Sequence, residues 1–481
     1  MTESTISLSA RDRTVIAVLL VSTFVVILNE TIMSVALPVL LTDLDITASV
    51  GQWLTGGFLL TMSVVIPITG FLIRRVSTRV LYGAAMGLFS TGTLVAALAP
   101  GFGVLMVARV VQAGGTSIML PLLMTTVMTL VPPARRGAIM GNISIVIAVA
   151  PAIGPTVSGL VLSVLGWRFM FWLVLPIAVV TLVLGLRRIV DIGEPTDTRI
   201  DVVSVLLSVV GFGGLVYGLS SIGQAASGEV VPLWVPFVAG GLGLVAFVLR
   251  QLQLQRTDGA LLDLRTFRAR TFTTASILMM LMMAALLGTI VLLPIYMQTV
   301  LGLDPLGTGL LLLPGGLLMG LLGPIVGRLY DKVGARMLLV PGAVVTSAAL
   351  WFATLFTATS SMWLVLVFHL MLSAGLAFAF TPLFTAGLGA VEPRLYSYGS
   401  AIFSTTQQLA GAAGVALLVS VLSVREAALA AGGASEVEQT AGGIHAAFLV
   451  AACLSVVAVA GAFLIRTPAQ EQAAADAVPV H

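Results

Sequence analysis

Two charged side chains, Glu30 and Arg109, lie inside stretches of sequence that are otherwise apolar. A carboxylate within a membrane-spanning helix costs on the order of 2.5–3.5 kcal/mol, and desolvation favours its protonated form. Such a group can take up a proton near physiological pH and exchange it for a cation. We therefore expect Glu30 to be a proton carrier. The alternative is a structural charge that is paired with a neighbour.

Arg109 is the second charge and stays ionised, so it needs hydrogen-bond acceptors if it is embedded. Those acceptors are a carboxylate such as Glu30 or backbone carbonyls of a neighbouring helix, and the sequence leaves both open. If the apolar span begins near residue 108, Arg109 merely snorkels at the end of the span.

Other polar residues within apolar runs are weaker candidates. His369 is either a second protonatable group or a hydrogen-bonded packing residue. Asn29 either packs or contacts a substrate, and a substrate cavity is expected at Asn29, Met33 and Gln112. The chain has one cysteine, Cys453, and no cluster with metal-ligand or nucleophile–base spacing, so we expect neither a metal site nor an enzyme.

Gly154 and Pro155 stand in a run with a further proline and glycine nearby. Prolines interrupt the helical hydrogen-bond ladder and glycines allow close helix contact, which suits an element that bends during conformational change. Helix packing alone would also explain the glycines.

The composition shows which solvent surrounds these residues. Only 9% of the 481 residues are charged, against about 25% in soluble domains. Hydrophobic residues make up 58% and the mean hydropathy is +1.12. The apolar runs are long and continuous rather than alternating, which excludes a lipid-facing barrel. We expect an all-α polytopic membrane protein.

Apolar runs between polar breaks predict about fourteen spans. They lie near residues 14–38, 50–73, 80–99, 103–131, 137–164, 167–186, 202–222, 232–250, 273–299, 307–327, 337–356, 361–388, 399–424 and 443–465. The basic residues test this count, because Arg and Lys collect on the cytoplasmic side. Twenty of the 23 fall in the loops of one side, whereas Arg168 and Arg425 fall on the other and Arg109 stays within a span. Both termini are therefore expected in the cytoplasm, and the basic residues mark topology rather than nucleic-acid binding.

An internal repeat divides the chain. The segment Gly70–Arg79 resembles Gly327–Arg336, 257 residues later. The repeat predicts two six-helix bundles with two inserted central helices, a layout typical of secondary transporters whose site lies between the repeats. The expected parts are a cytoplasmic N-terminus (1–13), a first bundle (14–186), the two inserted helices with a cytoplasmic linker (187–272), a second bundle (273–466) and a cytoplasmic tail (467–481).

The single lysine, Lys332, is flanked by Asp331 and Val333, so the chain has no phosphate-binding loop of the ATPase type. Transport is expected to use an ion gradient or to run downhill.

With these features assembled, the sequence resembles the major facilitator superfamily, in particular its fourteen-span drug:proton antiporter branch, close to the lincomycin-resistance-type exporters. Leu28–Pro38 is similar to the first-span motif of that family, Arg109–Gly115 to the fourth-span arginine motif and Gly154-Pro155 to the fifth-span antiporter motif. Trp167-Arg168 resembles the opening of the sixth span.

Three departures from the family pattern stand out. Asn29 replaces a common Asp, and Glu30 supplies the carboxylate one position later, which turns it by about 100° around the helix. The first loop motif has Arg74 where Asp is usual and Ser77 where Gly is usual. Only the second copy is intact, so gating is expected to rest on its members: Gly327, Asp331, Gly334 and Arg336, with Gly154 and Pro155 as the bending element.

The resemblance implies the major facilitator fold and a proton-coupled exporter of drugs, antibiotics such as lincosamides, and dyes, working by alternating access in the plasma membrane. The implied partners are a small molecule, protons and the bilayer, with no cofactor beyond the proton gradient and no nucleic acid, and a monomer is expected to function. A dedicated exporter of an endogenous metabolite or lipid precursor is the alternative.

Overall fold

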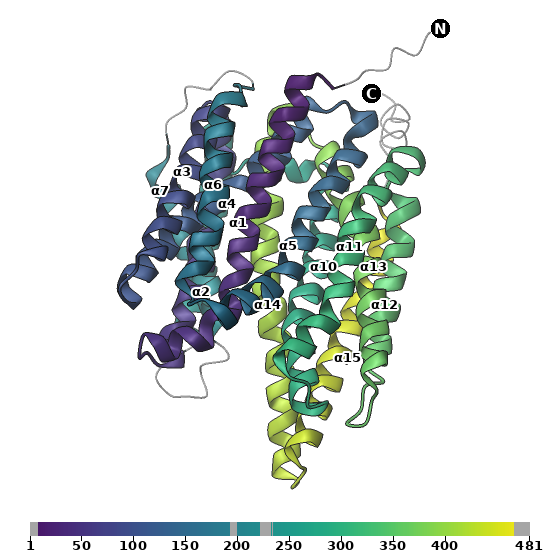
Figure 1. The fold of residues 1–481 in the computed structure, drawn as a ribbon. Coiled ribbons are helices and arrows are strands. Elements are labelled where there is room, and N and C mark those ends of the chain that lie inside the picture. The colour runs from purple at the N-terminus through teal and green to yellow at the C-terminus, as the bar shows by residue number, and fades with distance from the viewer. Residues whose placement is uncertain (1–7, 193–199, 222–231, 233, 466–481) are drawn as a thin grey trace.

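The computed structural model describes residues 8–192, 200–221, 232 and 234–465, which form a bundle of long helices (Figure 1). The predicted tail 467–481, residues 1–7 of the predicted N-terminus and parts of the predicted linker region (193–199, 222–231 and 233) lie outside the described residues. The side chain of Pro155 lies outside them as well.

The described residues contain fourteen helices that are long and apolar enough to span a membrane. The first bundle contains α1 (Ala10–Asp43), α2 (Ala48–Arg75), α3 (Thr78–Ala97), α4 (Phe102–Leu130), α5 (Arg136–Val164) and α6 (Arg168–Arg188). Two spans are inserted between the bundles in the sequence. The first consists of α7 (Val202–Ser208), the π-turn η2 (Val209–Gly213) and α8 (Gly214–Ser221), and the second is α9 (Trp234–Leu254). The second bundle contains α10 (Arg270–Ile295), which continues into η6 (Tyr296–Val300), α11 (Pro305–Val333), α12 (Arg336–Ala353), α13 (Met362–Gly389), α14 (Tyr396–Ala431) and α15 (Glu436–Ala462). The predicted all-helical fold with fourteen spans is confirmed.

Capping residues explain where the helix ends differ from the predicted spans. The last span was expected to begin at 443, but α15 begins at Glu436 because Ser435 and Glu438 form a capping box there. Similarly, α14 continues seven residues beyond 424 through an alanine-rich segment, since alanine is the strongest helix former. Hydropathy detects the membrane-spanning part of a helix and misses the polar turns that extend it.

The two bundles lie side by side, the first in purple to blue and the second in green to yellow (Figure 1). They meet along two seams, α5 against α11 and α2 against α14. The α5–α11 seam is built on glycine: a Cβ on Gly327 would lie 2.2 Å from the carbonyl oxygen of Gly137, and one on Gly141 would lie 2.3 Å from that of Gly323. These backbones approach so closely that no side chain fits between them.

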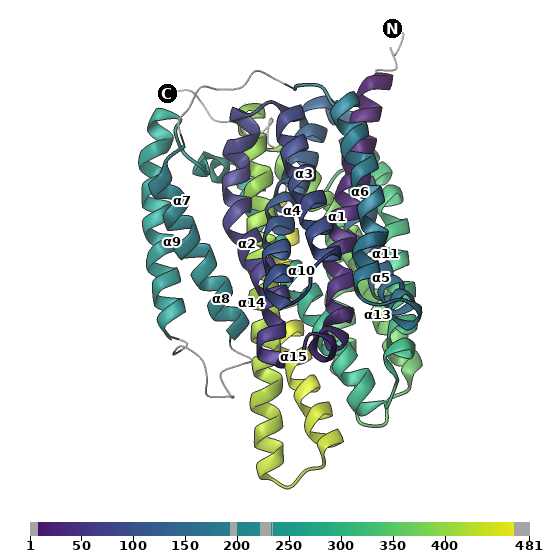
Figure 2. The same cartoon turned by 60° about the vertical axis from the view of Figure 1, so that its left-hand side comes forward.

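The inserted helices α7–α9 pack on the outside of the first bundle, against α2, with α8 reaching α14 (Figure 2). After α9 the chain passes through two short 3-10 turns, η4 (Gln255–Thr257) and η5 (Leu264–Arg268), into α10. We call residues 255–269 the linker. Its central residues Ala260–Asp263 are buried, so the linker is packed into the body of the protein.

Candidate functional site

Arg109 is fully buried within the first bundle. Its Nε donates a hydrogen bond to the backbone oxygen of Leu54 on α2 at 3.2 Å, and its Nη1 donates to Oε1 of Gln112 at 3.2 Å. The guanidinium lies 4.0 Å from the ring centroid of Phe58, in cation–π geometry. A snorkelling position at a helix end is therefore excluded, and a backbone carbonyl is one of the acceptors that the sequence left open.

Gln112 holds Arg109 in this orientation. It lies one helical turn after Arg109 on α4, so both side chains share a face of the helix. Its Nε2 donates to Oγ1 of Thr93 on α3 at 2.9 Å, while its Oε1 accepts from Arg109. Both ends of the carboxamide are thus hydrogen-bonded, so Gln112 connects Arg109 to Thr93 on α3.

Glu30 lies half-buried on α1, and its charge interacts electrostatically with that of Arg109. Among the described residues the two do not form a direct ion pair, and Nη2 of Arg109 has no hydrogen-bond partner. The charge of the arginine therefore reaches the carboxylate without immobilising it. A carboxylate placed in this way can gain and lose a proton while the surrounding helices stay packed.

Two of the predicted cavity residues lie close to Glu30 in the chain. Asn29 and Met33 are both buried, and Nδ2 of Asn29 has no hydrogen-bond partner among the described residues. An unpaired amide in an apolar interior is costly, so this group is available to a bound molecule or water. Their part in substrate binding stays a prediction.

The residue after Glu30 packs α1 against α5. A Cβ on Gly154 would lie 2.2 Å from Oγ1 of Thr31, so glycine is required for this approach. One turn further on, Ser158 donates a hydrogen bond to the backbone oxygen of Ile32 at 3.0 Å. The helix that carries Glu30 is thereby attached to α5, the helix that forms the seam with the second bundle.

Asp331 joins the two bundles at one end of that seam. Its carboxylate accepts hydrogen bonds from the backbone N–H groups of Gly137 at 2.8 Å and Ala138 at 2.9 Å, in the first turn of α5. The first N–H groups of a helix lack partners within the helix and carry a partial positive charge, so a carboxylate is well placed there. The predicted gating residue thus bridges the bundles.

The other predicted gating residues surround Asp331. Gly327 lies one turn earlier at the glycine contact with Gly137. Gly334 ends α11 with φ 81°, a left-handed conformation that favours glycine. Arg336 begins α12, and its guanidinium lies 5.8 Å from the ring centroid of Phe463. Of these three, only Gly327 contacts the first bundle, whereas Gly334 and Arg336 shape the end of α11 and the start of α12.

Arg74 forms a different contact at the equivalent place on the other seam. Its Nη1 donates to the hydroxyl of Tyr398 on α14 at 3.1 Å, and the guanidinium lies 5.3 Å from the ring centroid. The same hydroxyl donates to the backbone oxygen of Ala260 in the linker at 3.2 Å. No sequence pattern singles out Tyr398. The repeat points only to its partner, because the residue 257 positions before Asp331 is Arg74.

Most of the described hydrogen bonds between the bundles lie toward the arginine-rich ends of the helices, whereas Nε2 of Gln408 donates to Sδ of Met62 at 3.5 Å nearer the middle of α2. Besides those of Asp331 and Arg74, Thr125 donates to Oγ of Ser400 at 3.1 Å, and the hydroxyls of Ser144 and Thr381 lie 2.7 Å apart. We call this end the arginine-rich face; it contains the loops around Arg74–Arg79, Arg135–Arg136, Arg187–Arg188, Arg250–Arg270, Arg328–Arg336 and Arg394. The bundles are closed against each other at this face.

His369 lies apart from the Glu30–Arg109 pair. It is on α13 of the second bundle, where its Nε2 lies 3.0 Å from the backbone oxygen of Leu312 on α11, and its Nδ1 has no partner among the described residues. Its described contacts fit the hydrogen-bonded packing role, and a role as a second protonatable group stays a prediction.

The part of the chain that the structure describes contains no group of three or more His, Cys, Asp or Glu side chains that could hold a metal ion.

Comparisons with known proteins agree with this arrangement. The profile of the Major Facilitator Superfamily matches residues 19–415. The lincomycin resistance protein LmrB of Listeria monocytogenes is 38% identical over 462 residues, covering 94% of this chain and 97% of that protein. LmrB of Bacillus subtilis is 38% identical over 455 residues, covering 93% and 94%. A multidrug resistance protein B homolog of Mycobacterium tuberculosis is 28% identical and covers 82% of this chain and 73% of that protein.

Solved structures share the fold at low sequence identity. The human organic anion transporter MFSD10 superposes with a TM-score of 0.68 at 15% identity, covering 94% of this chain and 99% of that one. The proton:xylose symporter XylE superposes with a TM-score of 0.63 at 15% identity, covering 96% and 97%.

Proposed function

This chain belongs to the Major Facilitator Superfamily, a family of multi-pass membrane transporters of small molecules, and we propose that it exports drug-like compounds from the cytoplasm in exchange for protons. The proposed substrates are amphipathic or cationic molecules, with lincosamides first, because relatives named for lincomycin resistance align with nearly the whole chain. The proposed setting is the plasma membrane, with the arginine-rich face toward the cytoplasm. We propose that a monomer is sufficient and that the proton gradient takes the place of a cofactor.

The observation that carries the proton-coupling proposal is the relation of Glu30 to Arg109. The carboxylate lies within the electrostatic reach of a buried guanidinium that is held by Leu54 and Gln112. When Glu30 is ionised, the two charges balance and the site tolerates a cationic substrate nearby. When Glu30 takes up a proton, the charge of Arg109 is uncompensated and a cationic substrate is repelled. One proton thus weakens substrate binding without any change in the arginine.

The same site is connected to the seam between the bundles. Thr31 and Ile32 follow Glu30 and contact α5 at Gly154 and Ser158, and α5 is held to Asp331 of α11 at the arginine-rich face. In the proposed cycle, substrate enters from the cytoplasm while Glu30 is ionised. Protonation from outside releases the substrate, and the halves rock back to deliver the proton inward, each state being favoured by what is bound.

Transport in inverted membrane vesicles tests the function. With a proton gradient imposed, we expect uptake of lincomycin and of cationic dyes that stops when the gradient is collapsed. Endogenous metabolites are assayed in the same vesicles. If a metabolite is transported and none of the drugs is, the chain is a dedicated metabolite exporter and the drug-export proposal is wrong.

A further inference from the structure

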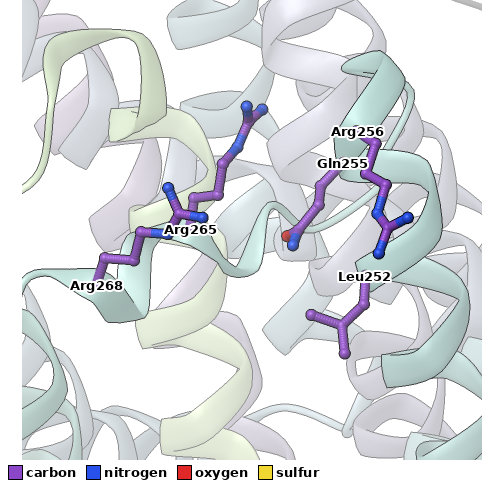
Figure 3. A pocket seen from close by; sticks show the side chains of 5 residues that line it. All are labelled: Leu252, Gln255, Arg256, Arg265 and Arg268. Carbon is purple, nitrogen blue, oxygen red and sulfur yellow. The ribbon is translucent and has the colours of Figure 1, made fainter.

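A pocket lined by arginines opens at the arginine-rich face, away from Glu30. It has a volume of about 420 Å³ and lies between the end of α9 and the linker (Figure 3). Leu252 lines it from α9, Gln255 and Arg256 line it from η4, and Arg265 and Arg268 line it from η5. None of the residues of the proposed transport cycle lines it.

Of the three arginines in the pocket, Arg256 and Arg268 carry charge that no carboxylate of the described residues compensates, whereas Arg265 is paired. Its Nε donates to Oδ1 of Asp263 at 2.9 Å and its Nη2 contacts Asp258. The hydrogen bond from Arg265 holds the pKa of Asp258 below its usual range, so this carboxylate stays ionised. Arg256 and Arg268 are exposed and form no ion pair with the residues that the structure describes. The pocket therefore offers two free guanidinium groups to an anion.

A third polar group in the pocket also lacks a partner. The Oε1 atom of Gln255 is buried and has no hydrogen-bond donor among the described residues. Its carboxamide extends from η4 toward the side of the pocket that contains Arg265 and Arg268 (Figure 3). A ligand that carries both a phosphate and a hydroxyl would satisfy all three groups, since guanidinium groups bind phosphate with charge-assisted hydrogen bonds and a hydroxyl can donate to the amide oxygen.

The surface that leads into the pocket is apolar. Exposed hydrophobic residues follow one face of α9 at helical spacing; they are Trp234, Val238, Leu242, Val245, Leu249 and Leu252. At 1.5 Å per residue this stripe is about 27 Å long, close to the thickness of a hydrocarbon core of about 30 Å. Its last member, Leu252, lines the pocket. An acyl chain lying on the stripe would bring a lipid headgroup directly to the arginines.

We propose that this pocket binds the headgroup of an anionic phospholipid with a hydroxylated headgroup, of the phosphatidylglycerol kind, whose chains lie along α9. Arg256 and Arg268 contact the phosphate, and Gln255 accepts from the headgroup hydroxyl. The bound lipid joins the inserted helices to the linker, which contacts Tyr398 through Ala260. The proposal depends on the chain being a membrane protein and not on its substrate.

Lipid retention in nanodiscs tests the proposal. The protein is placed in phosphatidylcholine bilayers containing phosphatidylglycerol, and native mass spectrometry measures the phosphatidylglycerol that stays bound. Replacing Arg256→Gln and Arg268→Gln together is expected to weaken binding about a hundredfold, a factor of about ten for each contact of ~1.4 kcal/mol. The matched control replaces Arg187→Gln and Arg188→Gln, two exposed arginines of the same face at the end of α6, and is expected to retain wild-type binding.

Further arms separate the possible ligands. If the control variant loses as much phosphatidylglycerol binding as the Arg256/Arg268 variant, the lipid is attracted to any basic surface and the proposal is overturned. Displacement of the lipid by inorganic phosphate at equal concentration would overturn it as well. A Gln255→Leu variant leaves both arginines in place and is expected to bind phosphatidylglycerol no better than phosphatidic acid, whereas the wild type prefers phosphatidylglycerol. No preference in the wild type would contradict the assignment of the headgroup hydroxyl.

Discussion

The carboxylate of Asp331, near the end of α11, accepts a hydrogen bond from the backbone N–H of Gly137 in the first turn of α5, across the boundary between the two bundles, at 2.8 Å. A second N–H, that of Ala138, donates to its other oxygen. One acidic side chain thus caps a helix of the opposite bundle, and this contact has to break whenever the arginine-rich face opens.

Replacing Asp331→Asn should shift the protein toward states in which this face is open. The amide keeps one acceptor but loses the charge, which costs on the order of 1 kcal/mol, so the open population should increase about fivefold.

Spin labels at Arg187→Cys and Met337→Cys measure the distance between the two bundles at this face, because both positions are exposed and each lies on a different bundle. The exposed Cys453 is first replaced by serine. Glu392→Gln, an exposed acid of the same face, is the control, and equal distributions in both variants would remove the gating role of Asp331.

The glycine contact of the α5–α11 seam gives a prediction on stability. Gly327→Ala would place a Cβ 2.2 Å from the carbonyl oxygen of Gly137, and overpacking of this kind costs about 1–3 kcal/mol. We expect a lower melting temperature in detergent. Gly309→Ala on the same helix has open space around the new Cβ and should be neutral or stabilising, because alanine is the better helix former. A melting temperature that is equal in the two variants would mean that the seam yields without cost.

Arg109 should tolerate no replacement. Arg109→Lys keeps the charge but cannot donate to both Leu54 and Gln112 in the geometry of the guanidinium, so we expect at least a tenfold lower transport rate in folded protein. Arg109→Ala removes the donor to the buried backbone oxygen of Leu54 and to Gln112, and each buried polar group left unpaired costs about 1–3 kcal/mol, so we expect a markedly lower melting temperature. Arg188→Lys, at an exposed site, is the comparison for both measurements. Wild-type rates in Arg109→Lys would show that charge alone is sufficient.

The inserted helices predict a pH dependence of stability. Asp201, just before α7, is bonded to Arg250 of α9 at 3.0 Å, and this hydrogen bond lowers the pKa of Asp201 from 3.8 to about 2. Because the folded pKa is depressed, the stabilisation is fully present above about pH 4 and disappears as the pH falls toward 2. Asp201→Asn should lower the melting temperature at neutral pH by about 1–2 °C. The difference from the wild type should shrink in acid; a difference that grows there would contradict this assignment.

The sequence was sufficient for the fold because hydropathy and arginine placement are local properties. Every predicted span corresponds to a helix, and the errors lie in polar turns such as the one capped by Ser435. The site was predicted less completely. Gln112 is predicted as a cavity residue and not as a partner of Arg109, although the two are only one helical turn apart. Leu54 and Phe58 belong to another helix, and their approach depends on how α2 packs against α4.

Contacts between the bundles were the least predictable. Arg74 and Tyr398 are 324 residues apart, and no local pattern connects them. The repeat supplied the one usable signal, since it equates Arg74 with Asp331. The repeat could not show that Arg74 contacts the ring of Tyr398 where Asp331 caps the start of α5, because these contacts depend on the side chains of the opposite bundle.

The central claim is that Glu30 carries the proton, and substrate-induced proton release from purified protein tests it most directly. In weakly buffered detergent solution, addition of a transported cationic dye should release protons from the wild type and none from Glu30→Gln, whose folding is checked by its melting temperature. Glu436→Gln, at an exposed site on α15, should release as many protons as the wild type. Undiminished release from Glu30→Gln would contradict the account and place the coupling proton on another residue.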